Sequence, residues 1–233
     1  MIPKLIHQTS RSKILSPEEE RLRRRTAKIL PNWKMNIWDD RDNIEIVRKS
    51  FPDHFDKFMA IKRGVVKADI VRCVYLYAFG GLYIDTDYKI LRPIGDEILK
   101  CYCVLPVSRS DDQASPDFRI CNSVLASEPR HPFWEGFLNR IFTFPDLEQL
   151  PESLVEKVTG PEGLTRFYLD NRNVYTDLYV APRKFFHPLI TCKGLSYDRS
   201  YPSYGAHLCW GSWRSKGIFK SVKTFITRKL TSF

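Results

Sequence analysis

One segment, residues 65–87, restricts the folds open to this chain more than any other. Residues 65–79 are rich in apolar side chains and contain no helix breaker, so they predict a mostly buried helix. Gly80 and Gly81 tolerate positive φ and are expected to end this helix. Residues 82–84 then predict a short strand that leads into an acidic turn. The order helix, glycine pair, strand and acidic turn indicates an α/β fold built in layers.

The rest of the chain predicts both kinds of element. Ser16, followed by Pro17 and two glutamates, indicates a helix start, because serine caps helices and proline and acids suit a first turn. We expect helices at 16–30, 132–142 and 164–169, a turn at 160–163, and strands at 2–7, 33–38, 101–107 and 204–210. With 233 residues and no repeat or linker, the chain predicts one domain over residues 1–216, followed by a basic amphipathic helix within 217–233.

The acidic turn holds the first candidate site. Asp85 and Asp87 stand two residues apart at the end of a predicted strand, so their carboxylates can point to the same side. Such a pair offers the hard oxygen ligands that Mg²⁺ and Mn²⁺ prefer. The chain contains 16 Asp, so roughly one DxD pair is expected by chance. A second pair, at residues 40–42, is flanked by charges and is predicted to be a solvated turn.

The helix before the turn carries two charges on one face. Asp69 and Arg72 are spaced i,i+3 in an otherwise apolar stretch. Because isolated charges are very costly to bury, this pair must be compensated internally or must serve a ligand. A salt bridge within the helix, near the surface, is the plainer alternative. Ligand sites in α/β sheets gather outside the carboxyl ends of strands, which is where the acidic turn is predicted.

The same region resembles the donor-site signature of family 32 glycosyltransferases, the sugar-binding-region proteins that contain a DXD motif. The resemblance covers residues 67–87, which read KADIVRCVYLYAFGGLYIDTD. Further segments resemble this family in the expected order, at 2–8, 33–40, 122–132, 159–161 and 207–213. The family includes the yeast initiating α-1,6-mannosyltransferase and bacterial capsular and lipopolysaccharide enzymes. One position departs from the pattern: Ser10 stands where the first motif often has Trp, so no base-stacking residue is assigned there.

The resemblance implies a GT-A type nucleotide-diphospho-sugar transferase fold, an α/β domain with a mainly parallel central sheet flanked by helices. It implies a divalent ion, Mn²⁺ or Mg²⁺, held by Asp85, Asp87 and His207, with the two aspartates as catalytic residues. The implied donor-binding residues are His7, Gln8, Asp69, Arg72, Asp85, Asn122 and Trp213. A core histidine at position 207 and a packing tryptophan at position 213 are the alternatives that the residues themselves leave open.

The implied reaction moves a hexosyl group from a UDP- or GDP-sugar to a hydroxyl of a glycan or lipid-linked glycan, with retention of configuration, and the expected setting is bacterial surface polysaccharide synthesis. Two other functions are open to a chain with these residues. A metal-dependent phosphoryl-transfer enzyme would need further acidic ligands for a second ion. A nucleic-acid-binding module rests only on the net charge of +10 and lacks a recognisable motif, so we expect no nucleic-acid partner.

Composition and termini bear on location. The chain has no apolar run long enough to span a bilayer and no signal-peptide pattern at its start, so we expect a cytoplasmic protein with free cysteines. Residues 218–233 place Ile, Phe and Leu on one side of a predicted helix and Lys and Arg largely on the other. This pattern suits an anionic bilayer, which predicts a peripheral position on the inner face of the cell membrane. A helix packed on its own domain is the alternative.

A chain truncated after Lys216 is therefore expected to bind anionic lipid vesicles less than the complete chain, because both the apolar stripe and the basic charges are removed. Co-sedimentation with anionic vesicles measures the effect, and neutral vesicles serve as the control. Equal sedimentation of the two chains would exclude a membrane role for this segment.

Overall fold

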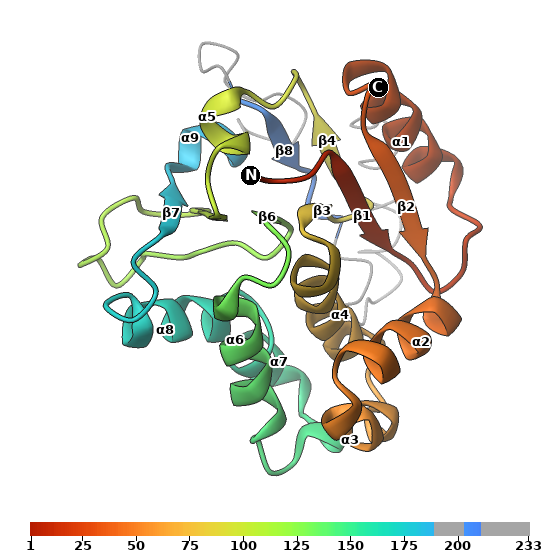
Figure 1. Ribbon diagram of the computed structural model, residues 1–233, viewed down its shortest axis with the longest axis vertical. Coiled ribbons are helices and arrows are strands. Elements are labelled where there is room, and N and C mark those ends of the chain that lie inside the picture. The colour runs from red at the N-terminus through yellow and green to blue at the C-terminus, as the bar shows by residue number, and fades with distance from the viewer. Residues whose placement is uncertain (189–202, 211–233) are drawn as a thin grey trace, which may run out of the picture.

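A computed structural model describes residues 1–188 and 203–210 of the protein (Figure 1). At its centre lies a six-stranded sheet in the order β2-β1-β3-β6-β5-β7. The strands are β1 (Leu5–Thr9), β2 (Lys34–Trp38), β3 (Gly81–Ile84), β5 (Cys103–Pro106), β6 (Val124–Ser127) and β7 (Leu178–Ala181). β1 is parallel to β2 and β3, and β5 is parallel to β7, whereas β6 is antiparallel to both its neighbours. The predicted α/β fold with a mainly parallel sheet is confirmed.

Helices cover both faces of this sheet. One face packs against α2 (Asp40–Ser50), α3 (Phe55–Ala60), α4 (Gly64–Phe79), α6 (Pro132–Phe142), α7 (Glu152–Val158) and α8 (Pro161–Asn171), which occupy the lower part of Figure 1. The other face holds α1 (Pro17–Ile29), α5 (Asp96–Leu99), α9 (Arg183–Phe186) and a ribbon of β4 (Tyr88–Ile90) and β8 (Gly205–His207). The sheet is thus the middle layer of three.

Two hydrophobic cores follow from the alternation of strand side chains. On β3, Leu82 and Ile84 enter one core and Tyr83 enters the other, as the period of two requires. α4 is buried on nearly every side of its middle turns, which agrees with the absence of a polar stripe in the predicted helix. This helix packs against the sheet and against α2 and α6, so it is the centre of the core that contains Tyr83.

The first two helices both begin at a capping box. Ser16 caps α1 and exchanges hydrogen bonds with Glu19, as predicted for this helix start. Asp39 caps α2 and exchanges hydrogen bonds with Asp42 in the same way. Residues 40–42 form the first turn of α2 and not the predicted loop turn, and acidic side chains there interact favourably with the helix dipole. Asp40 and Arg41 are exposed, as predicted.

Other predicted elements differ at their ends. β1 occupies Leu5–Thr9 and not residues 2–7, since Pro3 has no N–H for strand pairing. α8 begins at Pro161, inside the predicted turn, because proline suits the first helical position. The late strand predicted at 204–210 is limited to β8, which pairs with the equally short β4. The predicted C-terminal helix within 217–233 lies outside the described residues.

The structure also describes the cysteines and the lengths of the helices, for which free thiols and no membrane-spanning segment are expected. Five cysteines lie in the described ranges, and all five are free thiols, at positions 73, 101, 103, 121 and 209. Within residues 1–188 and 203–210, no helix combines the length and apolar character needed to cross a bilayer.

The glycine pair turns α4 into β3. Gly80 and Gly81 both have positive φ, 63° and 96°, a region that favours glycine. A Cβ atom at Gly81 would lie 2.6 Å from the carbonyl oxygen of Leu5, because β3 pairs directly with β1. The close approach of these two strands therefore depends on the missing side chain.

Gly81→Ala is expected to lower the free energy of unfolding by at least about 2 kcal/mol, because alanine is strained at this φ and would collide with β1. Gly64→Ala is the matched control, since a Cβ there meets nothing within 4 Å. Urea denaturation of both variants measures the difference. Equal stability of the two variants would contradict this account of the β1–β3 contact.

Candidate functional site

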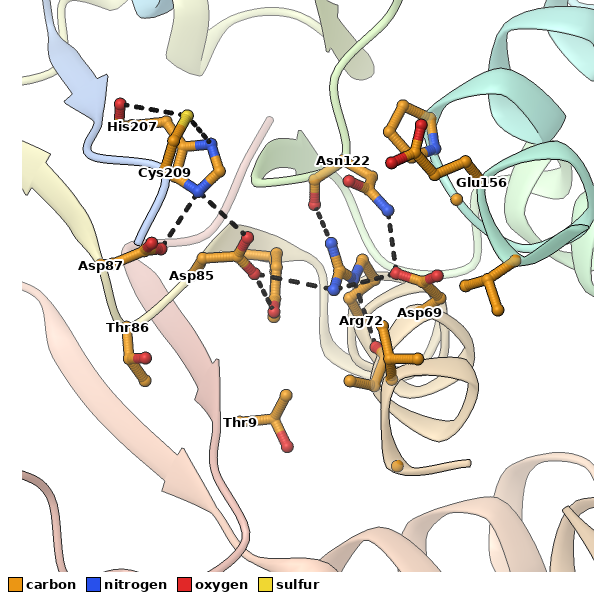
Figure 2. A pocket seen from close by; sticks show the side chains of 17 residues that line it. Thr9, Asp69, Arg72, Asp85, Thr86, Asp87, Asn122, Glu156, His207 and Cys209 are labelled. Atoms are coloured by element: carbon orange, nitrogen blue, oxygen red, sulfur yellow. Dashed lines mark hydrogen bonds and ion pairs between the residues drawn. The ribbon is translucent and has the colours of Figure 1, made fainter. Parts of the chain in front are cut away.

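The carboxyl ends of β1 and β3 open onto a cavity of about 470 Å³ (Figure 2). Its walls come from Thr9 at the end of β1, the first half of α4, the turn between β3 and β4, and three later segments around residues 122, 155–161 and 207–209. The cavity thus lies where ligand sites are expected in α/β sheets.

Three titratable side chains converge at one end of this cavity (Figure 2). Asp85 and Asp87 lie in the β3–β4 turn, and His207 ends β8, which pairs with β4. His207 Nε2 lies 3.1 Å from Asp87 Oδ1 and 3.7 Å from Asp85 Oδ2. One ligand atom from each residue lies within 4.8 Å of the other two, so the three side chains can hold one metal ion. The structure therefore brings together the three metal ligands implied by the sequence resemblance.

The charges of this triad depend on one another. Burial opposes a charge on His207, but the Asp87 carboxylate raises the pKa of the imidazole well above its ordinary value. Burial also disfavours a charged Asp87, yet His207 and the Trp210 N–H, 2.8 Å from Oδ2, lower the pKa of that carboxyl. Burial raises the pKa of Asp85, although the Arg72 guanidinium counteracts it. The two carboxylates therefore favour a positive charge between them, which the imidazolium provides.

A buried ion pair of α4 lies beside the triad. Arg72 Nη2 is 3.1 Å from Asp69 Oδ1 and 3.6 Å from Asp85 Oδ1. The salt bridge within the helix, the plainer alternative for this pair, is present, but the side chains of Asp69 and Arg72 are only 5% and 7% exposed, so it is buried and not near the surface. Burial raises the pKa of Asp69 to about 6, although Arg72 and Thr159 act in the opposite direction. Arg72 is thus shared between its own helix and the acidic turn.

Hydrogen-bond donors complete this network. Asn122, a predicted donor-binding residue, donates from Nδ2 to Asp69 Oδ1 at 2.9 Å. The backbone carbonyl of Asn122 accepts a hydrogen bond from Arg72. Two further donors escaped sequence reasoning. Thr159 Oγ1 donates to Asp69 Oδ2 at 2.9 Å, and the Tyr83 hydroxyl donates to Asp85 Oδ1 at 2.6 Å. Both lie in segments that resemble the family, but only the requirement that buried carboxylates find donors indicates this role.

His7 and Gln8 do not line the cavity. His7 is fully buried, with Trp38 Nε1 donating to its Nδ1 at 3.1 Å and its Nε2 lying 2.9 Å from the Gly80 carbonyl oxygen. Burial lowers the pKa of His7 to about 4, so its ring is neutral. Gln8 Nε2 donates to the Asp85 carbonyl at 3.4 Å. Both side chains therefore contact backbone carbonyls next to the site and do not reach the cavity. Thr9 is the residue of β1 that lines the cavity.

Two later segments of the chain, around residues 155–161 and at residue 209, form the remaining walls of the cavity. Cys209 lines the cavity, and its Sγ lies 3.4 Å from His207 Nδ1. Glu156 lies across the cavity from the triad (Figure 2), and Val155, Gly160 and Pro161 line the cavity as well. Trp213, implied as a donor-binding residue, lies outside the described residues.

The part of the chain that contains α4 and the acidic turn matches a known protein family. Residues 16–105 match the family model described as "Glycosyltransferase sugar-binding region containing DXD motif". This range includes α4, β3 and the acidic turn, and the resemblance found in the sequence is confirmed there.

Curated relatives are found in fungi and in a virus. A mannosyl phosphorylinositol ceramide synthase of Saccharomyces cerevisiae is 29% identical over 161 residues, which are 69% of this chain and 40% of that protein. The initiation-specific alpha-1,6-mannosyltransferase of Schizosaccharomyces pombe is 26% identical, with 91% of this chain and 64% of the relative covered. An uncharacterized glycosyltransferase of Acanthamoeba polyphaga mimivirus is 25% identical, with coverages of 100% and 91%. The chain thus spans only part of the length of both fungal relatives.

The fold is also found in solved structures. The PaToxG glycosyltransferase aligns with a TM-score of 0.52 at 21% identity, over 72% of this chain and 69% of that chain. The predicted GT-A type fold is confirmed by this likeness together with the sheet described above.

The raised pKa of Asp69 predicts a pH dependence of stability. Between its ordinary value of 3.8 and about 6, the folded protein retains a proton that the unfolded chain has lost. The stabilisation from Asp69 is therefore present below pH 4 and is lost as the pH rises to about 6, by on the order of 2–3 kcal/mol. Urea denaturation across this range should give a steeper loss of stability for the wild type than for Asp69→Asn. Parallel pH profiles would contradict the raised pKa.

Proposed function

We propose that this chain is a member of the glycosyltransferase family with a DXD-motif sugar-binding region and that it transfers a hexosyl group from a nucleotide-diphosphate sugar to a hydroxyl of a glycan or lipid-linked glycan. The observation that carries the proposal is a single cavity in which the Asp85–Asp87–His207 triad lies beside the buried Asp69–Arg72 pair. The first group suits a metal-bound diphosphate, and the second suits sugar hydroxyls.

The triad fits a divalent ion, for which Mn²⁺ is the first candidate and Mg²⁺ the second. Two carboxylates supply hard oxygen ligands, and imidazole is a ligand that suits transition metals better than Mg²⁺. When bound, such an ion supplies Lewis-acid stabilisation of the departing diphosphate. His207 would have to be neutral at Nε2 to serve as a ligand, so binding of an ion there would release the proton of this nitrogen.

The sugar is proposed to lie against α4. Asp69 offers carboxylate oxygens to donor hydroxyls, while Arg72 and Asn122 hold it in place. Because Thr159, Asn122 and Arg72 already occupy part of its hydrogen-bonding capacity, its orientation is fixed before a ligand arrives. Fixed geometry of this kind lowers the cost of ordering the donor on binding.

The bond that breaks joins the anomeric carbon to the diphosphate, and the bond that forms joins that carbon to the acceptor oxygen. The acceptor is proposed to enter beside Glu156, which lies across the cavity from the triad (Figure 2) and lines it together with Val155, Gly160 and Pro161. We propose retention of configuration by attack on the same face, as the family resemblance implies. Arg72 contributes positive charge next to Asp85, close to where negative charge develops.

The named relatives narrow the choice of donor. Two of them are mannose-transferring enzymes by name, so mannose is the first sugar to test and GDP-mannose the first donor. One of them acts, by name, on a phosphorylinositol ceramide, a lipid acceptor with an anionic headgroup, and the net charge of +10 suits such an acceptor surface. A bacterial polysaccharide role, a cytoplasmic location and the peripheral membrane position stay predictions.

A thermal-shift screen of nucleotide sugars with and without Mn²⁺ tests the donor site. A donor at about 100 times its Kd is expected to raise the Tm by roughly 5–10 °C, because it binds only the folded state. The stabilisation should require the ion, and the same mixture should release nucleoside diphosphate when an acceptor is added. Phosphodiester cleavage without sugar transfer would overturn the proposal.

Asp87→Ala is expected to lower kcat/KM by a factor on the order of 10²–10³ or more while the protein stays folded, because one carboxylate ligand is lost. Asp40→Ala is the matched control. It removes an aspartate from the other DxD pair, which begins α2 and does not line the cavity. Nucleoside diphosphate release, with circular dichroism as the folding check, distinguishes the two. Wild-type activity in purified Asp87→Ala would remove Asp87 from the mechanism.

A further inference from the structure

The middle residue of the acidic turn makes a contact that the proposed reaction does not use. The hydroxyl of Thr86 donates a 2.7 Å hydrogen bond to Oε1 of Glu19, in the first turn of α1. Figure 2 shows the Thr86 side chain on the side of the turn away from the two carboxylates. The contact therefore acts on the backbone of the turn and not on a ligand in the metal site.

Glu19 uses its two carboxylate oxygens for different purposes. Oε2 accepts hydrogen bonds from the backbone N–H and the hydroxyl of Ser16, at 2.9 and 2.8 Å, which fixes the start of α1. Oε1 is left for Thr86. α1 is itself anchored, since Arg25 Nε donates to the Ile90 carbonyl of β4 at 3.1 Å. Glu19 thus connects a fixed helix end to the turn between β3 and β4.

The turn is held from three sides, one for each residue. Asp85 is held by Arg72 and Tyr83, and Asp87 by the segment that contains His207. Thr86 is held by Glu19. Because the peptide units on either side of Thr86 join the two aspartates, their conformation sets the separation and direction of the two carboxylates.

We propose that Glu19 is a positioning residue of the metal site, which fixes the acidic turn through Thr86 so that Asp85 and Asp87 face one ion. The inference rests on the proposed function, because it requires that the triad binds a divalent ion. Without the hydrogen bond the turn has more freedom, and the ion must order it on binding. Supporting residues of this kind typically change metal affinity by about 10- to 100-fold when they are replaced.

Four variants separate positioning from helix stability. Thr86→Val keeps the shape of the side chain and removes its hydroxyl, and Glu19→Ala removes the acceptor. Glu19→Gln keeps a hydrogen-bonding group of the same length without the charge. Ser16→Ala is the matched control, because it weakens the cap of α1 and leaves the Thr86–Glu19 contact in place.

The Kd for Mn²⁺ alone, from the electron paramagnetic resonance signal of the free ion, and the Tm of the ion-free protein are measured for each variant. Thr86→Val and Glu19→Ala are each expected to weaken Mn²⁺ binding by about tenfold. Combining these two substitutions in one protein is expected to cause no additional loss of affinity. Glu19→Gln is expected to restore most of the affinity. Ser16→Ala is expected to lower the Tm by about 2–4 °C with the wild-type Kd.

Unchanged Mn²⁺ affinity in Thr86→Val would overturn the positioning role. Equal losses of affinity in Ser16→Ala and Thr86→Val would also overturn it, because stability of α1 alone would then explain the effect. If Glu19→Gln bound Mn²⁺ as weakly as Glu19→Ala, the charge of Glu19 and not its hydrogen bond would control the site. A wild-type protein that does not bind Mn²⁺ would overturn the metal site of the proposed function itself, and the inference with it.

Discussion

The rest of the site depends on the ion pairs that Arg72 forms with Asp69 and Asp85. This guanidinium lies in the middle of an apolar helix, where an uncompensated charge would cost several kcal/mol. Asp69 on the same helix and Asp85 on the turn provide the compensation, at 3.1 and 3.6 Å. The need to neutralise one buried cation therefore joins the central helix to the end of β3, and it places the carboxylates of Asp69 and Asp85 beside the same guanidinium.

The sheet gives this pair its position. β3 lies between β1 and β6, so the turn that follows it receives support from both sides. Gln8 at the end of β1 donates to the carbonyl of Asp85, and the amide of Asp85 donates to the carbonyl of Ser123 just before β6. These contacts support the backbone of the turn from both neighbouring strands.

Local signals in the sequence were enough for one half of the site and not for the other. α4, the glycine pair and the two aspartates follow one another directly, so density of apolar residues and spacing identify them. The pairing of Asp87 with His207 depends on the register of β4 and β8, which no local pattern contains, and only the family resemblance indicated it. The resemblance implied that His7 binds the donor, but the alternation of β1 directs this side chain into the core. Thr159 and Tyr83 were missed because the need for them arises only once two carboxylates are buried.

The position of His207 in the chain has a consequence for synthesis. All six strands of the central sheet end by Ala181, whereas the imidazole that completes the triad comes 120 positions after Asp87. A nascent chain that emerges from the ribosome at about 5–20 residues per second therefore carries the sheet and both aspartates before the third ligand appears. The two carboxylates then lack the positive partner that faces them in the complete protein. The candidate metal site can therefore form only after His207 has been synthesised, and a chain that stops before this residue would carry the sheet and both aspartates without the third candidate ligand.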